Sequence, residues 1–137
     1  MKYTKSNCLL PDLKCTYEQA AGFDLPCAEA QDLLPGIITK ISTGISIEPP
    51  PGYYIQLYLR SSAAQKGLLL QGGVIDPDYR GIIHFIIYNL NSYSIPISAG
   101  DYLVQGILIP HTLMQPICIE QLPTTLRQDQ GFGSSSI

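Results

Sequence analysis

Short apolar runs alternate with turn-forming residues along most of the chain, and this pattern favours an all-β fold. The runs are rich in branched and aromatic residues, which strands prefer, and glycine, proline, asparagine or aspartate stands between them. Seven segments fit this description: 37–41, 45–47, 53–59, 68–70, 82–90, 102–109 and 116–121. Helix is scarce, because only residues 62–66, followed by Gly67, have the composition of a short helical turn that ends at a glycine.

The apolar pattern ends at Leu122, and the last residues are polar and rich in glycine and serine. A chain of 137 residues is large enough to enclose one compact core. We therefore expect a single β domain over residues 1–126 and a mobile C-terminal arm over residues 127–137, since such termini are poorly ordered unless something holds them.

Composition and charge narrow the class of protein. The net charge is -3 and only 14% of the residues are charged, so we expect no direct nucleic-acid binding, which needs a basic face. The four cysteines match no C-x-x-C metal pattern and no dense disulfide framework, so we expect reduced thiols. No apolar run is long enough for a signal peptide or a membrane span. We expect a soluble intracellular protein, cytoplasmic or nuclear, with no membrane partner.

The segment 72–81, which reads G-G-V-I-D-P-D-Y-R-G, is the strongest candidate for a functional site. It holds two acids, a tyrosine and an arginine between glycines, and it lies between two predicted strands, so we expect a hairpin. Asp76 follows an apolar pair, and a strand end gives the rigid placement that a general base needs. We interpret Asp78 and Arg80 as a structural ion pair.

The residue pattern does not decide the roles of several other polar residues. Asp24 lies among apolar neighbours, where a carboxylate needs water, a metal or an amide, although it could equally cap a turn. Arg60 and the two serines after it could bind an anion, or could be a surface arginine and an ordinary N-cap serine. Gln105 interrupts an apolar strand, where a lone glutamine commonly faces outward. His84 and His111 have no partner at ligand spacing, which favours packing over catalysis.

Taken in order along the chain, five islands resemble the five motifs of the homotrimeric dUTPases. They are A-G-F-D-L (21–25), R-S-S-A-A-Q-K-G (60–67), G-G-V-I-D-P-D-Y-R-G (72–81), G-D-Y-L-V-Q (100–105) and R-Q-D-Q-G-F-G-S-S (127–135). The resemblance covers nearly the whole chain, and the third motif is the most specific. It implies a distorted jelly-roll-like subunit of the β-clip type with one short helix. It also implies a homotrimer whose shared active sites each draw motifs from all three chains.

The activity implied by the resemblance is the hydrolysis of dUTP to dUMP and pyrophosphate with Mg²⁺. Water would attack the α-phosphorus, and no covalent enzyme intermediate is expected. This reaction limits uracil incorporation into DNA and supplies dUMP for thymidylate synthesis.

The third motif would bind the nucleoside. The resemblance implies that Asp76 orients and deprotonates the attacking water and contacts the deoxyribose 3'-hydroxyl. The backbone of Gly73 and Val74 would read uracil and reject cytosine, and Ile75 would belong to the same substrate pocket. Tyr79 would lie under the sugar and leave no space for a ribose 2'-hydroxyl.

The first, second and fourth motifs would bind the triphosphate. The resemblance implies that Asp24 holds water in the shell of Mg²⁺, an ion that keeps several waters and binds mainly through phosphates. Arg60, Ser61, Ser62 and Gln105 would surround the α- and β-phosphates.

The fifth motif would close over the bound nucleotide. Phe132 would stack on uracil, while Arg127, Ser134 and Ser135 would meet the γ-phosphate. Glycines such as Gly133 would allow the chain to bend. Closure of this arm would exclude bulk water and align the triphosphate.

The chain departs from the family pattern at several positions. Tyr102 stands where the fourth motif usually has arginine, so packing would replace a structural ion pair. Ser62 stands where glycine is frequent in the second motif, a change that a helix-opening turn tolerates. Gln128 and Gln130 occupy arm positions often held by glycine, which bears on catalytic rate more than on the identity of the substrate.

Two alternatives remain to be weighed. A dCTP deaminase shares the fold, but its family carries a catalytic glutamate in the strand after the third motif, where this chain has Ile86. A catalytically weakened nucleotide-binding or interaction protein would need fewer of the motif side chains than this chain keeps. The terminal S-S-I fits a short PDZ-ligand pattern, which arises often by chance.

Overall fold

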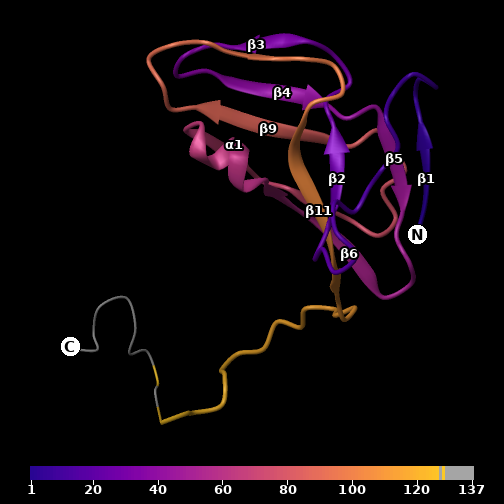
Figure 1. Ribbon diagram of the computed structural model, residues 1–137. Helices are drawn as coiled ribbons and strands as arrows, with labels where there is room; N and C mark the ends of the chain where they lie inside the picture. Colours follow the sequence, from indigo (N-terminus) through magenta and orange to yellow (C-terminus); the bar gives the residue numbers. More distant parts are fainter. Residues whose placement is uncertain (127, 129–137) are drawn as a thin grey trace.

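The computed structural model describes residues 1–126 and residue 128, and within them the chain is built almost entirely of strands. Figure 1 shows the strands wrapped around a common centre, with a C-terminal segment that runs away from the body. The elements are β1 (Lys2–Lys5), β2 (Phe23–Pro26), β3 (Gln31–Leu33), β4 (Ile38–Ser42), β5 (Ile45–Glu48), β6 (Tyr53–Leu59), α1 (Ser61–Gln65), β7 (Leu68–Gln71), β8 (Val74–Ile75), β9 (His84–Asn89), β10 (Ile95–Ile97) and β11 (Tyr102–Pro110). The expected all-β class with one short helix is confirmed.

The strands form four sheets. The largest has the order β2-β11-β6-β8, a second has the order β4-β9-β7, and the pairs β1-β5 and β10-β3 complete the fold. Every pairing between these strands is antiparallel. Alternate residues of the two larger sheets face one core: Ile55 and Leu57 of β6 and Phe85 and Ile87 of β9 are at most 1% exposed.

Strand β11 brings distant parts of the sequence together. It pairs with β2 on one side and with β6 on the other, so that Gln105 lies opposite both Asp24 and Tyr58. The next residue must be small, because a Cβ at Gly106 would lie 2.6 Å from the ring of Phe23. The close approach of β2 to β11 therefore sets Gln105 beside Asp24.

Most of the expected strands are confirmed, with boundaries that move by one or two residues. The pattern missed β1, β2, β3 and β10, which are short and contain charged or polar residues or proline, and it missed β8, which is only two residues long. The expected strand at residues 116–121 is wrong, because that segment is exposed and pairs with no strand among the described residues. An apolar run forms a strand only where a neighbouring strand satisfies its backbone.

The segment 72–81 is more than the turn of a hairpin. Strands β7 and β9 pair with each other as expected, but the chain between them also forms β8, which joins a different sheet by pairing with β6. Gly72 and Gly73 have φ of +68° and +114°, which a residue with a side chain rarely adopts, and they let the chain leave one sheet for the other.

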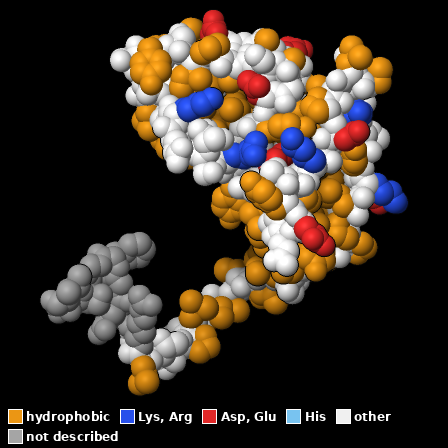
Figure 2. Space-filling view, viewed as in Figure 1, with side chains coloured by type: hydrophobic (Ala, Val, Ile, Leu, Met, Phe, Trp, Pro, Cys, Tyr) orange, Lys and Arg blue, Asp and Glu red, His pale blue; other side chains and the backbone are white. Residues whose placement is uncertain are grey.

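The segment after β11 exposes a row of apolar side chains. Figure 2 shows hydrophobic atoms along the extended chain where it leaves the body. The exposed apolar residues in this segment are Leu113, Met114, Ile117, Ile119, Leu122 and Leu126. Such a row in water is unfavourable, and exposed apolar patches are typical of interaction surfaces.

The cysteines differ sharply in environment, and this generates a first prediction. All four thiols are free; Cys27 is fully buried, while Cys8, Cys15 and Cys118 are exposed. Burial, helped by the negative charge of Asp101, raises the pKa of the Cys27 thiol to about 12. Since the thiolate is the reactive form, iodoacetamide at about pH 8 should modify the three exposed cysteines in the folded protein and Cys27 only after denaturation. Peptide mass spectrometry measures this, and labelling of Cys27 in the native state would contradict it.

Candidate active site

The predicted site residues are divided between two separate pockets. The first, which we call the Asp76 pocket, has a volume of about 240 Å³ and is lined by Val74, Ile75, Asp76, Tyr79 and His84. The second, which we call the Asp24 pocket, has a volume of about 180 Å³ and is lined by Thr16, Tyr17, Ala20, Gly22, Asp24, Arg60, Ser61 and Gln105. The two pockets share no lining residue.

Strand β8 forms one wall of the Asp76 pocket. It is an edge strand whose partner is β6, and the carbonyl of Gly73 just before it accepts a hydrogen bond of 2.8 Å from the N–H of Leu57. A Cβ at Gly73 would lie 3.2 Å from both the Cβ and the carbonyl oxygen of Leu57, so glycine permits this close approach. The outer edge of β8 then presents backbone N–H and C=O groups that its own sheet does not use.

Tyr79 is held in place although its ring is half-exposed. Its hydroxyl donates a hydrogen bond of 2.9 Å to the carbonyl oxygen of Ile82. The ring lies directly over Gly81, where a Cβ would come within 2.6 Å of the Tyr79 Cζ atom. The glycine that ends the third motif therefore makes room for the tyrosine two residues before it.

The expected ion pair between Asp78 and Arg80 is wrong. The Arg80 guanidinium donates instead to the carbonyl oxygens of Pro77, at 2.8 Å, and Tyr79, at 3.1 Å. The tight turn brings these backbone carbonyls close to the guanidinium, which therefore pairs with them and not with the Asp78 carboxylate. Arg80 thereby stabilises the turn that follows Asp76.

His84 is a pocket residue that the sequence pattern assigned to packing. Its Nδ1 atom lies 2.9 Å from the carbonyl oxygen of Ile82, and its half-buried ring lines the Asp76 pocket. The alternation of apolar residues along β9 could have indicated this position. Phe85 and Ile87 face the core, so His84 faces the other side of the strand.

Asp24 is nearly fully buried, and both of its carboxylate oxygens are occupied. Oδ1 lies 3.2 Å from Nε of Arg60, and Oδ2 accepts a hydrogen bond of 2.6 Å from the Thr16 hydroxyl. The partners are thus a guanidinium and a hydroxyl rather than the amide or turn N–H that the sequence left open. A buried carboxylate requires such partners, and the ion pair draws Arg60 to the pocket wall.

The helical turn begins one residue earlier than expected, and its serines are not caps. Arg60 is the residue at the N-cap, and its carbonyl accepts hydrogen bonds of 3.0 Å from the N–H groups of Ala63 and Ala64. No side chain caps the helix, so the ordinary N-cap reading of the serines is wrong. Ser61 and Ser62 are exposed, and the structure brings Ser61, but not Ser62, to the lining of the Asp24 pocket.

Tyr102 makes a cation–π contact where the fourth motif usually has arginine. The Lys14 ammonium lies 4.5 Å from the centre of the Tyr102 ring. Burial raises the pKa of the Tyr102 phenol, and the nearby charges of Asp24 and Asp12 act in the same direction. The tyrosine thus packs under a lysine from the loop that precedes Asp24, in the place of an arginine ion pair.

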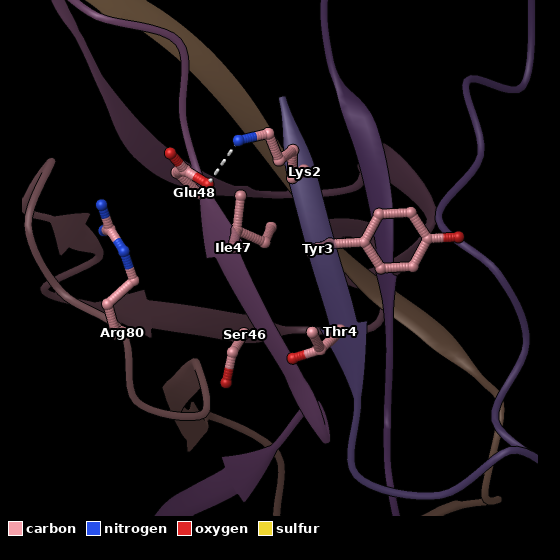
Figure 3. A pocket seen from close by; sticks show the side chains of 7 residues that line it. All are labelled: Lys2, Tyr3, Thr4, Ser46, Ile47, Glu48 and Arg80. Carbon is pink, nitrogen blue, oxygen red and sulfur yellow. Dashed lines mark hydrogen bonds and ion pairs between the residues drawn. The ribbon is translucent and has the colours of Figure 1, made fainter.

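A third cavity, larger than these two, is lined by residues of β1 and β5 and, from the third motif, by Arg80. It measures about 490 Å³ and lies against the β1-β5 pair. Figure 3 shows the ion pair of Lys2 and Glu48 at this pair of strands, Arg80 on the Glu48 side, and the Tyr3 ring pointing away on the other side. None of the predicted nucleotide-binding residues lines it, so we place the site at the two smaller pockets.

The arm residues Arg127, Phe132, Gly133, Ser134 and Ser135 lie outside the described residues, so their predicted contacts are not tested. Gln128 is described, and its φ of +48° falls in the left-handed region. Glycine adopts this conformation at little cost, which agrees with the frequent glycine at this position in the family. No group of three or more histidine, cysteine, aspartate or glutamate side chains that could hold a metal is present in the described part of the chain.

Strand β6 separates the two pockets. Ile75 pairs with Ile55 near the start of β6, whereas Arg60 follows the last residue of that strand. Five residues of strand correspond to roughly 15 to 20 Å, since a strand rises about 3.3 Å per residue. Asp76 and Arg60 therefore stand at opposite ends of β6 within one chain.

Comparison with known proteins identifies the same family along the whole chain. The family model for dUTPase matches residues 10–136. A deoxyuridine 5'-triphosphate nucleotidohydrolase from Wolinella succinogenes is 38% identical over 85% of this chain and 80% of its own length. The protein of that name from Escherichia phage T5 is 33% identical over 98% and 96%. The solved dUTPase of Staphylococcus bacteriophage 80alpha with dUPNHPP has the same fold, with a TM-score of 0.89 at 22% identity over 99% of this chain and 98% of its own.

The hydrogen bond from Thr16 to the buried Asp24 generates the second prediction. Thr16→Val keeps the shape of the side chain but removes the hydroxyl, so it should lower the free energy of unfolding by about 1.5 to 3 kcal/mol, as expected for a bond to a charged acceptor. Thr16→Ser keeps the hydroxyl and should be close to the wild type. Urea unfolding at matched protein concentration measures both, and equal stability of the valine variant and the wild type would contradict the prediction.

Proposed function

The chain belongs to the dUTPase family, and from that premise we propose how its two pockets divide the work on the substrate. The enzyme is a dUTP diphosphatase, which hydrolyses dUTP to dUMP and pyrophosphate. This activity limits uracil incorporation into DNA and supplies dUMP. The proposal rests on one observation: Asp76 and Tyr79 line one pocket, while Asp24, Arg60 and Gln105 line another.

The Asp76 pocket takes the nucleoside in this proposal. The N–H of Gly73 and the backbone of Val74 on the outer edge of β8 offer hydrogen-bonding groups to the edge of uracil, and Ile75 lines the pocket beside them. The Tyr79 ring, fixed by its hydrogen bond to Ile82, packs under the deoxyribose and leaves no room for a 2'-hydroxyl. Fixed partners of this kind reject bases with the opposite hydrogen-bonding pattern.

The Asp24 pocket takes the phosphates. The Asp24 carboxylate pairs with Nε of Arg60 and thereby orients the guanidinium. The two terminal nitrogens of Arg60 make no hydrogen bond among the described residues. A guanidinium with free terminal N–H groups suits phosphate oxygens. Ser61 and Gln105 add a hydroxyl and an amide to the same pocket, and Ser62 extends the polar surface beside it.

Asp76 acts as the general base. Its carboxylate takes a proton from a water as the water oxygen attacks the α-phosphorus in line, and the bond from the α-phosphorus to the bridging oxygen breaks. The products are dUMP and pyrophosphate, and the proton passes from Asp76 to solvent. A base held at the end of a strand has the fixed geometry that this step requires.

The family works with a divalent cation, and we propose Mg²⁺. A solved dUTPase from phage phi11 of S. aureus is described with a structural Mg(II) ion. Both oxygens of Asp24 already accept one donor, so Asp24 fits as an acceptor for a metal-bound water rather than as a direct ligand. Bound to the triphosphate, the ion would offset its negative charge.

We further propose that the C-terminal arm completes the site. Phe132 would cover uracil, and Arg127, Ser134 and Ser135 would hold the γ-phosphate, with Gly133 allowing the bend. The support is the motif resemblance alone, since these residues lie outside the described part of the chain.

The separation of the pockets supports a homotrimer with shared sites. One α-phosphorus must meet the water at Asp76 and the guanidinium of Arg60 at the same time, but β6 holds these residues apart in one chain. Pockets from two different copies can face each other across an interface between subunits. The exposed apolar residues after β11 are consistent with contact between copies.

The alternatives receive no support. Ile86, at the position of the deaminase glutamate, is an apolar residue on the outward face of β9. The side chains of Asp24, Arg60, Asp76 and Tyr79 all line the two pockets, so no described feature favours a weakened homologue. No helix among residues 1–126 is long and apolar enough to cross a membrane.

A nucleotide panel tests the function. With Mg²⁺, the purified protein should release pyrophosphate from dUTP and leave dCTP, dTTP and UTP almost untouched, because the fixed groups around the Asp76 pocket match one base and one sugar. A coupled pyrophosphate assay measures this. A chelator should abolish the activity if the cation is required. Comparable turnover of UTP would contradict the role of Tyr79.

Mixed subunits test the shared site. Asp76→Asn should lose about 10²- to 10⁴-fold in turnover, since it removes the base, and Arg60→Gln should also be nearly inactive. If each site takes Asp76 from one chain and Arg60 from another, co-expression of the two variants in equal amounts should restore about a quarter of the wild-type activity in a symmetric ring. Each variant alone is the control. No recovery in mixtures that are shown to contain both chains would contradict shared sites.

A further inference from the structure

Lys14 is a cation beside the Asp24 pocket that the proposed reaction leaves without a role. The N–H of Asp24 donates a hydrogen bond of 2.8 Å to the carbonyl oxygen of Lys14, and the two residues form an antiparallel bridge. Asp24 in turn lies opposite Gln105 of β11. Residues directly opposite each other in antiparallel strands project from the same face, so Lys14 stands in one row with two side chains of the pocket.

Tyr102 holds the Lys14 ammonium in place. The ammonium lies 4.5 Å from the centre of the Tyr102 ring, and the Tyr102 hydroxyl donates a hydrogen bond of 3.3 Å to the carbonyl oxygen of Asp12. The ring therefore contacts the loop on both sides of residue 13. Burial raises the pKa of the phenol, and the charges of Asp24 and Arg60 act on it in opposite directions, so the ring lies close to that ion pair.

No carboxylate among the described residues neutralises Lys14. The ion pairs in this part of the chain use Lys2, Lys5 and Arg60 as their cations. Asp24, the acid opposite Lys14, already has both carboxylate oxygens engaged, one by Arg60 and one by a hydroxyl. An aromatic ring attracts a cation but carries no net charge, so the cation–π contact leaves the exposed ammonium positive.

We propose that Lys14 is a further substrate-binding residue of the Asp24 pocket, whose ammonium binds the terminal phosphates of the nucleotide, and that Tyr102 is the positioning residue that holds it. The inference rests on the proposed function, in which this pocket takes the phosphates. The charge of Arg60 is partly offset by Asp24, so a second, unpaired cation adds to the attraction for a triphosphate. A lysine ammonium is a compact charge on a flexible stem, which suits phosphate oxygens.

The position of Lys14 selects the β- and γ-phosphates. Arg60, Ser61 and Gln105 are proposed to surround the α- and β-phosphates. Lys14 lies on the other side of Asp24 from Gln105 in the same row, so it reaches past these groups toward the end of the triphosphate. The β- and γ-phosphates leave together as pyrophosphate when the bond to the α-phosphorus breaks. Pyrophosphate should therefore keep the contact with Lys14, whereas dUMP should not make it.

Five variants separate the charge of Lys14 from its packing. Lys14→Met keeps an unbranched stem over the ring and removes the charge, whereas Lys14→Arg keeps the charge. Tyr102→Leu removes the ring, whereas Tyr102→Phe keeps it. Lys40→Met removes an exposed lysine on β4 that lines neither pocket, and it controls for the loss of a positive charge as such.

The measurements are the inhibition constants of pyrophosphate and of dUMP against dUTP hydrolysis, at fixed Mg²⁺ and ionic strength. Lys14→Met should raise the inhibition constant of pyrophosphate about 3- to 5-fold, as expected for one exposed ion pair, and leave that of dUMP unchanged. Tyr102→Leu should shift it in the same direction by a smaller factor. Lys14→Arg, Tyr102→Phe and Lys40→Met should match the wild type.

Two results would overturn the binding role of Lys14. One is an unchanged inhibition constant of pyrophosphate in Lys14→Met. The other is an equal rise for pyrophosphate and dUMP, which would show that Lys14 acts through the fold of the loop. An unchanged constant in Tyr102→Leu would overturn the positioning role of Tyr102. In each case the wild type would still hydrolyse dUTP, whereas failure of the proposed function requires an inactive wild type.

Discussion

The length of strand β6 is the constraint on which the arrangement of the site depends. At its start β6 pairs with β8 and thereby places Asp76, and directly after its end the chain turns into Arg60 and the short helix. A paired strand cannot be shortened or bent without losing ladder hydrogen bonds, so the two pockets keep their separation. The fold thus places two separate pockets on each chain, and in the proposed homotrimer pockets from different copies form one site.

In the Asp24 pocket, which we propose binds the phosphates, the burial of Asp24 determines the orientation of Arg60. A carboxylate at 5% exposure cannot remain unpaired, and Arg60 and Thr16 each satisfy one oxygen. The ion pair engages Nε of the Arg60 guanidinium, and the two terminal nitrogens are the ones that we propose to bind the ligand. An acid that looks like a metal ligand in the sequence is therefore, in the protein without ligand, first a group that positions the arginine.

The sequence predicted the elements that depend on neighbouring residues in the chain. It missed the contacts that depend on strand pairing between distant segments. Strand β6 was predicted to the residue, because its alternating apolar run needs no outside information. The link from Asp24 to Arg60 could not be predicted, since it is made by the pairing of β2 and β6 with β11. Residues of segment 72–81 line a pocket, and their predicted role in the site stays a prediction. The passage of this segment between two sheets could not be predicted because it follows from tertiary pairing, and Arg80 donates to backbone carbonyls and not to Asp78.

The separation of the Asp76 pocket from the Asp24 pocket implies, in the proposed function, that recognition of the base and recognition of the phosphates can change independently. The residues proposed to bind the nucleoside are positioned by the Ile82 carbonyl, which holds Tyr79, and by the pairing of β8, whereas Asp24 positions Arg60, which is proposed to bind phosphate. No hydrogen bond or ion pair among the described residues joins the two sets directly. Tyr102, which stands where the fourth motif usually has arginine, contacts Lys14 from the loop before Asp24 and so belongs to the side of the Asp24 pocket. In the proposed shared site, the interface between copies sets the distance between the two pockets.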